Sequence, residues 1–226
     1  MFVVLEGTDG SGKTEQFKLL NKALQGYGFK TKLVDFPQYG QPSAYFVQRY
    51  LNGDYGSLNE ISPKLASVFY AIDRIDVASE IRTALREGKI VLANRYIGSN
   101  MGHQGAKIVN KKKRRELIRW IYDFEYGICG IPKPDVNLFL HVPAKTAYEL
   151  IAHKSERSYL RGKKRDIHEA NINHLRQAEF SYLDTIKLYP KDFRVIECAP
   201  NNALLSINAV HQLILSALPA SIKKNI

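Results

Sequence analysis

The stretch Gly7-Thr8-Asp9-Gly10-Ser11-Gly12-Lys13-Thr14 matches the pattern G-x-x-x-x-G-K-[ST]. The apolar run 2–6 precedes it and a run of helical period, 13–25, follows it, which is the setting that a phosphate-binding loop requires. Glycines let backbone N–H groups turn toward phosphate oxygens, and the helix N-terminus adds a favourable dipole. Lys13 would reach the β- and γ-phosphates, and the Thr14 hydroxyl would bind Mg²⁺. The stretch therefore predicts a nucleoside triphosphate site.

Other features of the sequence separate the classes of protein that bind nucleoside triphosphates. We find no N-K-x-D guanine motif, no D-x-x-G element downstream of the loop, and no Walker-B aspartate where the third predicted strand ends in Ala93-Asn94-Arg95. Switch-type GTPases and motor ATPases are therefore not favoured, and a small-molecule kinase remains. Asp9 inside the loop fits a kinase, because it would lie beside Mg²⁺ or beside the hydroxyl of a second substrate.

Short apolar runs alternate with longer stretches of helical period along all 226 residues, a pattern typical of an α/β fold with a parallel sheet. The chain length indicates one domain, 1–226. We predict a five-stranded parallel sheet flanked by helices. The strands are expected at 2–6, 32–36, 90–93, 137–142 and 193–198, and the helices at 13–25, 62–85, 112–126, 144–153, 166–188 and 206–217.

The chain carries 33 Lys and Arg against 22 Asp and Glu, a formal net charge of +11. Two short stretches, 111–115 and 154–165, hold ten of these surplus charges, five each. Such a balance indicates an anionic partner, which can be a nucleic acid, a membrane surface or a phosphorylated small molecule. The stretch 154–165 is polar and contains Gly162, so we interpret it as a loop, whereas 111–115 is expected to form an exposed basic patch.

The two cysteines, Cys129 and Cys198, show no C-x-x-C spacing. The single disulfide that they could form is too little to stabilise a domain of this size. The sequence starts without a signal-peptide pattern, and no apolar run reaches the ~18 residues that a membrane span needs. These features predict a cytoplasmic protein that does not enter a membrane.

Several ordered motifs resemble those of the thymidylate kinases. They are Glu6-Gly7-Thr8-Asp9-Gly10-Ser11-Gly12-Lys13-Thr14, Phe36-Pro37-Gln38-Tyr39-Gly40, Tyr70-Ala71-Ile72-Asp73-Arg74, Asn94-Arg95-Tyr96 and Pro132-Lys133-Pro134-Asp135. The resemblance implies a P-loop NTPase fold with a lid segment at about 154–165. It also implies transfer of the ATP γ-phosphate to dTMP, dependence on Mg²⁺, and a homodimer, and it does not favour a nucleic acid as partner.

The resemblance also implies a role for individual residues. Tyr70 would stack on the thymine ring and Arg74 would bond the base edge, while Arg95 would clamp the monophosphate. Phe36 and Tyr39 would line the sugar and base, as would a loop that holds Asn100, His103 and Gln104. Catalysis would use Lys13, Asp9 and Arg95 together with lid arginines, of which Arg157, Arg161 and Arg165 are candidates and Arg161 and Arg165 the preferred pair. Asp9 and Thr14 would hold the metal ion.

Three residues depart from the family pattern. Asn94 stands where the family usually has Asp, which removes a negative charge near the magnesium site. The acceptor monophosphate is mostly ionised at pH 7, so it needs no general base, and we expect an active kinase in which Asp9 and Thr14 carry the metal. His103 replaces a family Tyr or Phe, and Gln38 replaces an Arg in some members. Acceptance of dUMP or UMP is therefore an open alternative.

Two further alternatives remain at the level of sequence. A deoxynucleoside kinase would need a carboxylate base near the sugar hydroxyl, and Asp9 alone is a poor candidate for it. An ATP-binding regulatory or nucleic-acid-binding protein would account for the basic clusters and for Asn94. Its affinity for RNA would fall steeply with salt and would not depend on Tyr70 or Arg74.

Overall fold

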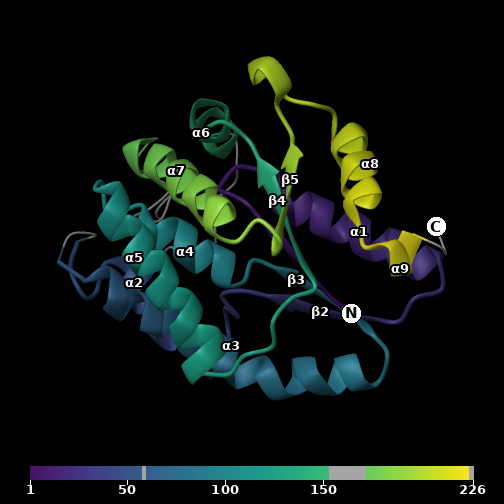
Figure 1. The fold of residues 1–226 in the computed structure, drawn as a ribbon, viewed down its shortest axis with the longest axis horizontal. Coiled ribbons are helices and arrows are strands. Elements are labelled where there is room, and N and C mark those ends of the chain that lie inside the picture. Colours follow the sequence, from purple (N-terminus) through teal and green to yellow (C-terminus); the bar gives the residue numbers. More distant parts are fainter. Residues whose placement is uncertain (58–59, 153–171, 224–226) are drawn as a thin grey trace.

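The computed structural model describes residues 1–57, 60–152 and 172–223. Its centre is a five-stranded parallel sheet in the order β2-β3-β1-β4-β5 (Figure 1). The predicted α/β fold with five parallel strands is confirmed. The strands are β1 (Phe2–Glu6), β2 (Thr31–Asp35), β3 (Ile90–Asn94), β4 (Val136–His141) and β5 (Phe193–Glu197).

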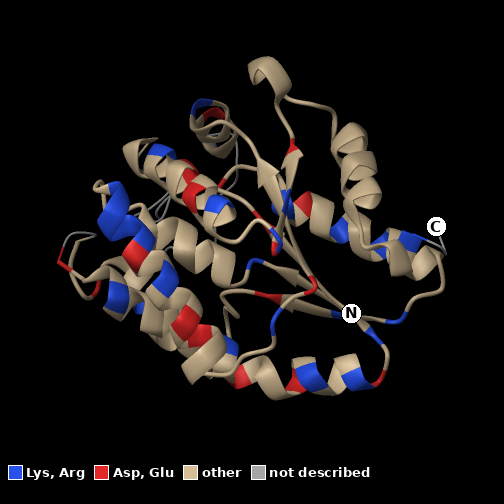
Figure 2. Ribbon diagram, in the orientation of Figure 1, with Lys and Arg blue, Asp and Glu red and all other residues tan. Residues whose placement is uncertain are grey.

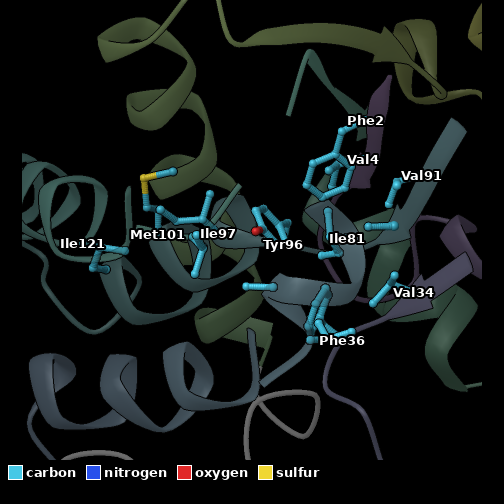
Figure 3. Packing of buried hydrophobic residues seen from close by; sticks show 14 of the residues in the cluster. Phe2, Val4, Val34, Phe36, Ile81, Val91, Tyr96, Ile97, Met101 and Ile121 are labelled. Atoms are coloured by element: carbon cyan, nitrogen blue, oxygen red, sulfur yellow. The ribbon is translucent and has the colours of Figure 1, made fainter. Parts of the chain in front are cut away.

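Helices cover both faces of the sheet, and β1 shows why its sequence is continuously apolar. Phe2 and Val4 pack into one helical layer and Val3 and Leu5 into the other, and none of the four has exposed surface. A central parallel strand that is covered on both faces has no solvent face on which polar residues could alternate. Figure 3 shows Phe2 and Val4 packed beside Ile81 and Tyr96 in the first of these layers.

Helices α3 (Pro63–Arg86), α4 (Ile97–Gly105), α5 (Lys111–Tyr122) and α7 (Ile172–Leu188) supply the first layer. The second layer comes from α1 (Lys13–Gly26), α6 (Ala144–Ala152), α8 (Ile207–Ala217) and α9 (Ala220–Lys223). A short 3₁₀ turn, η1 (Pro42–Ala44), leads into α2 (Tyr45–Asn52), which packs on α3 in a separate small cluster. A second 3₁₀ turn, η4 (Pro200–Asn202), follows β5. Within the described ranges, no helix is long and apolar enough to span a membrane.

Helix α4 corrects the prediction that Asn100, His103 and Gln104 lie in a loop. The glycines of this segment suggested a loop, but they serve the packing of a helix against α7. A Cβ atom at Gly102 would lie 2.3 Å from the Tyr182 ring, so the two helices approach closely only because residue 102 has no side chain. The side chains of α4 are consequently fixed by tight packing.

The predicted helix 112–126 is also different in the structure, because α5 ends at Tyr122 and continues as a π-helix, η2 (Asp123–Ile128). A π-helical turn holds an extra residue and is frequently found at functional sites. Here it carries Glu125, whose side chain has no exposed surface.

The basic run 111–115 is only partly the exposed patch that the sequence predicts. Lys111, Lys112 and Lys113 are exposed, and Figure 2 shows the basic start of α5 as a blue segment of the ribbon. Arg114 is buried, however, and its Nε and Nη2 donate to Asp184 Oδ2 of α7 at 2.9 and 2.7 Å, while Arg115 Nη2 lies 3.1 Å from Asp184 Oδ1. Two of the five cations therefore join α5 to α7.

Candidate nucleotide-binding site

The predicted phosphate-binding loop connects β1 to α1 at the carboxyl edge of the sheet. Its Lys13 is 6% exposed, and Lys13 Nζ donates to the carbonyl oxygens of Gly7 and Thr8 at 3.0 and 2.7 Å. The N-cap of α1 is Gly12, which has no side chain to occupy the first N–H groups of the helix. These N–H groups and the Lys13 ammonium form a site suited to phosphate.

Gly10 shows how closely this loop is packed. It adopts φ +83°, and a Cβ atom there would lie 2.3 Å from the carbonyl oxygen of Ala147 in α6. Any other residue would therefore push the loop away from α6. The loop keeps its shape because glycine supplies both the left-handed backbone and the close approach.

Arg95 and Asp9, both predicted catalytic residues, are in contact. Arg95 Nη2 donates to Asp9 Oδ1, and Arg95 Nη1 donates to the Gly7 carbonyl and to Ser99 Oγ, each at 3.2 Å. Arg95 has φ +68°, an unfavourable conformation for a residue with a side chain, which persists at functional sites when the surroundings impose it. The backbone turn at Arg95 brings its guanidinium back over the phosphate-binding loop.

Glu6 is a functional candidate that the sequence analysis quoted but did not single out. It is fully buried at the end of β1, and Oε1 accepts from the backbone N–H groups of Tyr96 and Ser99 at 2.8 and 3.0 Å. Its Oε2 accepts from Ser99 Oγ at 2.7 Å and from the Tyr182 hydroxyl at 3.1 Å. Glu6 thus caps the N-terminus of α4 with a negative charge, which fixes α4 beside the loop.

His103 lies on α4 next to Arg95 and Asp9. Its Nε2 is 3.4 Å from Arg95 Nη1 and 3.9 Å from Asp9 Oδ2, and its ring stacks on His174 with centroids 5.8 Å apart. Burial lowers the pKa of His103 to about 3, although Asp9 opposes the shift. The imidazole is therefore neutral at physiological pH and adds no positive charge to the site.

Arg74 and Asn100, predicted to contact the base, both bind Glu125. Arg74 is 2% exposed and donates to the Glu125 carboxylate from Nε at 2.5 Å and from Nη2 at 2.7 Å. Burial favours a lower pKa for Arg74, but the Glu125 carboxylate outweighs it, so the pKa lies above its ordinary value. Asn100 Nδ2 donates to Glu125 Oε1 at 2.8 Å. No motif marks Glu125, because its partners lie on distant parts of the chain.

The remaining predicted substrate residues have mixed environments. Gln104 is fully buried on α4, and neither amide atom has a hydrogen-bond partner among the described residues. Tyr70 is half-buried on α3 and packs edge-on against Tyr50, with ring centroids 6.1 Å apart. Phe36 packs in the core against Tyr96, whereas Tyr39 is exposed. The predicted lid with Arg157, Arg161 and Arg165 lies outside the described residues.

The donor set for a magnesium ion is small. Across 1–57, 60–152 and 172–223 no group of three or more His, Cys, Asp or Glu side chains could hold a metal. Magnesium is usually bound by one or two carboxylates together with substrate phosphates. Asp9, which is 6% exposed, and the exposed Thr14 at the start of α1 therefore fit an ion that arrives with a nucleotide. Asn94 Nδ2 donates to Asp35 Oδ1 at 2.9 Å, so the carboxylate beside Asn94 comes from β2.

Comparisons with known proteins identify the family of the chain. The family model "Thymidylate kinase" matches residues 5–214. The chain is 29% identical over 170 residues to the thymidylate kinase of Mycobacterium tuberculosis, covering 75% of this chain and 78% of that protein. It is 28% identical over 211 residues to a probable thymidylate kinase of Pyrococcus horikoshii, covering 93% and 91%. The solved structure of thymidylate kinase from Candida albicans has a TM-score of 0.74 at 21% identity, covering 99% and 92% of the two chains. The chain belongs to the thymidylate kinase family.

Proposed function

We propose that this chain transfers the γ-phosphate of ATP to dTMP and releases dTDP and ADP, as its family does. One observation carries the assignment of roles. The Gly7 carbonyl oxygen accepts from Lys13 Nζ at 3.0 Å and from Arg95 Nη1 at 3.2 Å. The cation expected to hold the donor phosphates and the cation expected to hold the acceptor phosphate thus meet at one atom, as transfer between two phosphates requires.

The reaction needs positioning and charge stabilisation more than proton transfer. The acceptor monophosphate is mostly ionised at pH 7 and attacks as an oxyanion. Arg95 would exchange its bonds to Asp9 and Gly7 for bonds to this monophosphate, and Lys13 would exchange carbonyl oxygens for the β- and γ-phosphates. Fixed cations around the migrating phosphoryl group lower the barrier without a general base.

Asp9 and Thr14 are the proposed holders of Mg²⁺. When bound with ATP, the ion supplies neutralisation of charge on the β- and γ-phosphate oxygens. Asp9 has a second role in our proposal, because its carboxylate fixes the Arg95 guanidinium until the acceptor arrives. The lid arginines Arg161 and Arg165 would add cations over the phosphoryl group.

The family match does not favour the alternatives of a deoxynucleoside kinase, a nucleic-acid-binding protein or a broader pyrimidine kinase. His103 bears on the strictness of substrate choice, since a neutral imidazole can bond a hydroxyl where an aromatic wall would exclude it. Cys129 and Cys198 are free thiols, which supports the proposal of a reducing compartment such as the cytoplasm.

We also propose a homodimer. Leu65, Val68, Ile72 and Ile75 recur at helical spacing on α3, and Leu65, Ile72 and Ile75 are 39–47% exposed. An exposed apolar stripe on one helix suits a self-complementary interface in which α3 packs against its copy.

The activity is tested by ADP release with dTMP, dUMP, UMP, thymidine or no acceptor. We expect turnover with dTMP and a loss of at least ~100-fold in kcat/KM for dTMP in Arg95→Ala, because the acceptor loses its clamp. Arg86→Ala, an exposed arginine at the end of α3, is the control and should match the wild type. Turnover with thymidine but not with dTMP would contradict the proposed function.

A further inference from the structure

Glu125 is a buried carboxylate without an assigned role. Its side chain has no exposed surface, and it lies on the π-helix η2 rather than on a loop of the site. Burial of a carboxylate is unfavourable unless cations and hydrogen-bond donors surround it. The identity of its partners therefore indicates what this carboxylate is for.

Within the described residues, the three hydrogen bonds to the Glu125 carboxylate come from residues proposed to contact the base. Oε1 accepts from Arg74 Nη2 at 2.7 Å and from Asn100 Nδ2 at 2.8 Å, and Oε2 accepts from Arg74 Nε at 2.5 Å. Arg74 belongs to α3 and Asn100 to α4. One carboxylate thus fixes the relative position of two side chains from two helices.

The bonds of Asn100 also determine which way its amide faces. Nδ2 donates both to Glu125 Oε1 and to the Ser67 carbonyl oxygen, at 2.8 and 3.1 Å. Both partners can only accept, so a flipped amide would place Oδ1 against two other oxygens. Oδ1 consequently stays on the opposite side, where it is buried without a hydrogen-bond partner in the described part of the chain. A buried acceptor left open in this way is suited to a ligand donor.

Arg74 presents the complementary chemistry. A guanidinium carries five N–H groups and no acceptor, and Glu125 takes Nε and one hydrogen of Nη2. Among the described residues Nη1 has no hydrogen-bond acceptor, so this group is suited to a ligand acceptor. The two side chains therefore offer an acceptor from Asn100 and donors from Arg74.

This arrangement matches one type of pyrimidine edge. Thymine and uracil present N3–H as a donor beside O4 as an acceptor, whereas cytosine presents N3 as an acceptor beside the N4 amino group. Cytosine would set its N3 against Asn100 Oδ1 and its amino group against Arg74. We propose that Glu125 is a positioning residue that selects thymine-type bases over cytosine by fixing the orientation of the Asn100 amide and the Arg74 guanidinium; this rests on the proposed function.

The variant Glu125→Gln tests the proposal. The Gln amide can donate to Asn100 Oδ1, so the Ser67 carbonyl oxygen alone is left to oppose a turn of the Asn100 Nδ2 toward the base. We expect the ratio of kcat/KM for dTMP to that for dCMP to fall at least tenfold, while the ratio for dTMP to dUMP stays unchanged, since both share the same edge. An unchanged dTMP/dCMP ratio in folded Glu125→Gln overturns the proposal. So does an equal fall in the dTMP/dUMP ratio, which would indicate general loosening of the site.

Asp184→Asn is the matched control, because Asp184 is also a buried carboxylate bound by an arginine, at 2.7 Å. It should lower the melting temperature and leave the dTMP/dCMP ratio unchanged. If Glu125→Gln does not fold, Asn100→Ala decides, since it keeps the Glu125–Arg74 pair and removes the whole Asn100 amide, both its acceptor and its donor. Its dTMP/dCMP ratio should also fall, and an unchanged ratio overturns the proposal. Wild-type enzyme without dTMP turnover would instead contradict the proposed function.

Discussion

Asn94 is the residue at which the chain departs most from its family pattern, and the structure shows what surrounds it. Asn94 and Asp35 face each other in register at the ends of β3 and β2, and the Asn94 amide donates to the Asp35 carboxylate. Desolvation of its carboxylate raises the pKa of Asp35, although Arg95 opposes the shift and the residue as a whole keeps exposed surface. A carboxylate is therefore present at this edge on the neighbouring strand, and the Asn94 amide donates to it.

Asn94→Asp would place a second carboxylate within hydrogen-bonding distance of Asp35. Two such groups cannot both ionise freely, so one pKa should rise, and the folded protein would then lose stability as pH rises through this raised pKa. We expect a lower melting temperature than wild type at pH 8 and a smaller difference at pH 5. A bound cation should relieve the repulsion, so the concentration of Mg²⁺ that gives half-maximal activity should fall severalfold.

Asn94→Ala removes the hydrogen bond without adding charge, and it serves as the control for this pair. It should show no tightening of the Mg²⁺ requirement. Asp9 and Thr14 are proposed to hold the metal ion without a negative charge at position 94. Identical Mg²⁺ titrations of wild type and Asn94→Asp would contradict this proposal.

The sequence predicts some site residues better than others, for a physical reason. Lys13 and Arg95 belong to local motifs whose neighbours determine their position. Glu6 and Glu125 act through partners about 90 and 51 residues away, Tyr96 and Arg74, and such pairs leave no local pattern. Only the folded chain reveals that these two carboxylates fix the positions of the motif residues.

At the scale of secondary-structure elements, His141 lies where four helices and strands meet. It ends β4, and its two ring nitrogens lie 2.9 Å from Glu179 of α7 and 2.7 Å from Glu197 of β5. Glu179 also accepts from the backbone N–H of Ala144, the first residue of α6, at 3.0 Å. The hydrogen bonds that the His141 ring donates to Glu179 and Glu197 raise the pKa of His141 to about 9, against the opposing effect of burial.

A raised histidine pKa gives a specific dependence of stability on pH. The stabilisation is fully present below the unfolded pKa of about 6.5 and is lost as pH rises through about 9. We expect the free energy of unfolding to fall by ~1–2 kcal/mol between pH 6.5 and 9.5, after allowance for solvent screening of a half-buried group. Urea unfolding curves across this range measure it.

His141→Gln should flatten this fall, because glutamine does not titrate. His211→Gln is the control, since His211 lies on α8 and burial lowers its pKa, so the fall between pH 6.5 and 9.5 should persist. An equal fall in wild type and His141→Gln would show that other groups cause it.

Elements were predictable where the pattern was local and strong. The five strands and the helices beginning at Lys13 and Pro63 follow from apolar runs and from stop and cap residues. Helix α4 was missed because its glycines, which indicate loops in isolation, are required by contact with Tyr182. The run 111–115 looked like a solvated patch because nothing local shows that Asp184 of α7 would bury Arg114.

At the scale of the whole molecule, the proposed dimer gives a prediction about the α3 stripe. Ile75→Asp should place a charge in the interface, and the molar mass from light scattering should shift from twice the chain mass toward that of one chain. Ile207→Asp is the matched control, since Ile207 is 56% exposed at the start of α8 and lies outside the stripe. A wild-type protein with the mass of one chain at micromolar concentration would contradict the dimer.

The strand order β2-β3-β1-β4-β5 could not be read from the sequence, since apolar runs do not reveal their neighbours. That order places β1 at the centre, with β3 on one side and β4 on the other. The loop after β1 and Arg95 after β3 therefore meet at the same edge. The functional site follows from this adjacency as much as from the motif.

The Gly7 carbonyl oxygen lies at this edge, and more hydrogen-bond donors contact it than it has lone pairs. Lys13, Arg95 and the Tyr182 hydroxyl of α7 lie 3.0, 3.2 and 3.3 Å from it, and a carbonyl oxygen has two lone pairs. The three donors therefore compete. In the proposed function a nucleotide phosphate would draw Lys13 away, which would leave the Gly7 oxygen to Arg95 Nη1 and to the Tyr182 hydroxyl, whose single hydrogen Glu6 also attracts. Occupation of the donor site would then change the bonding of residues 95 and 182 through a single shared atom.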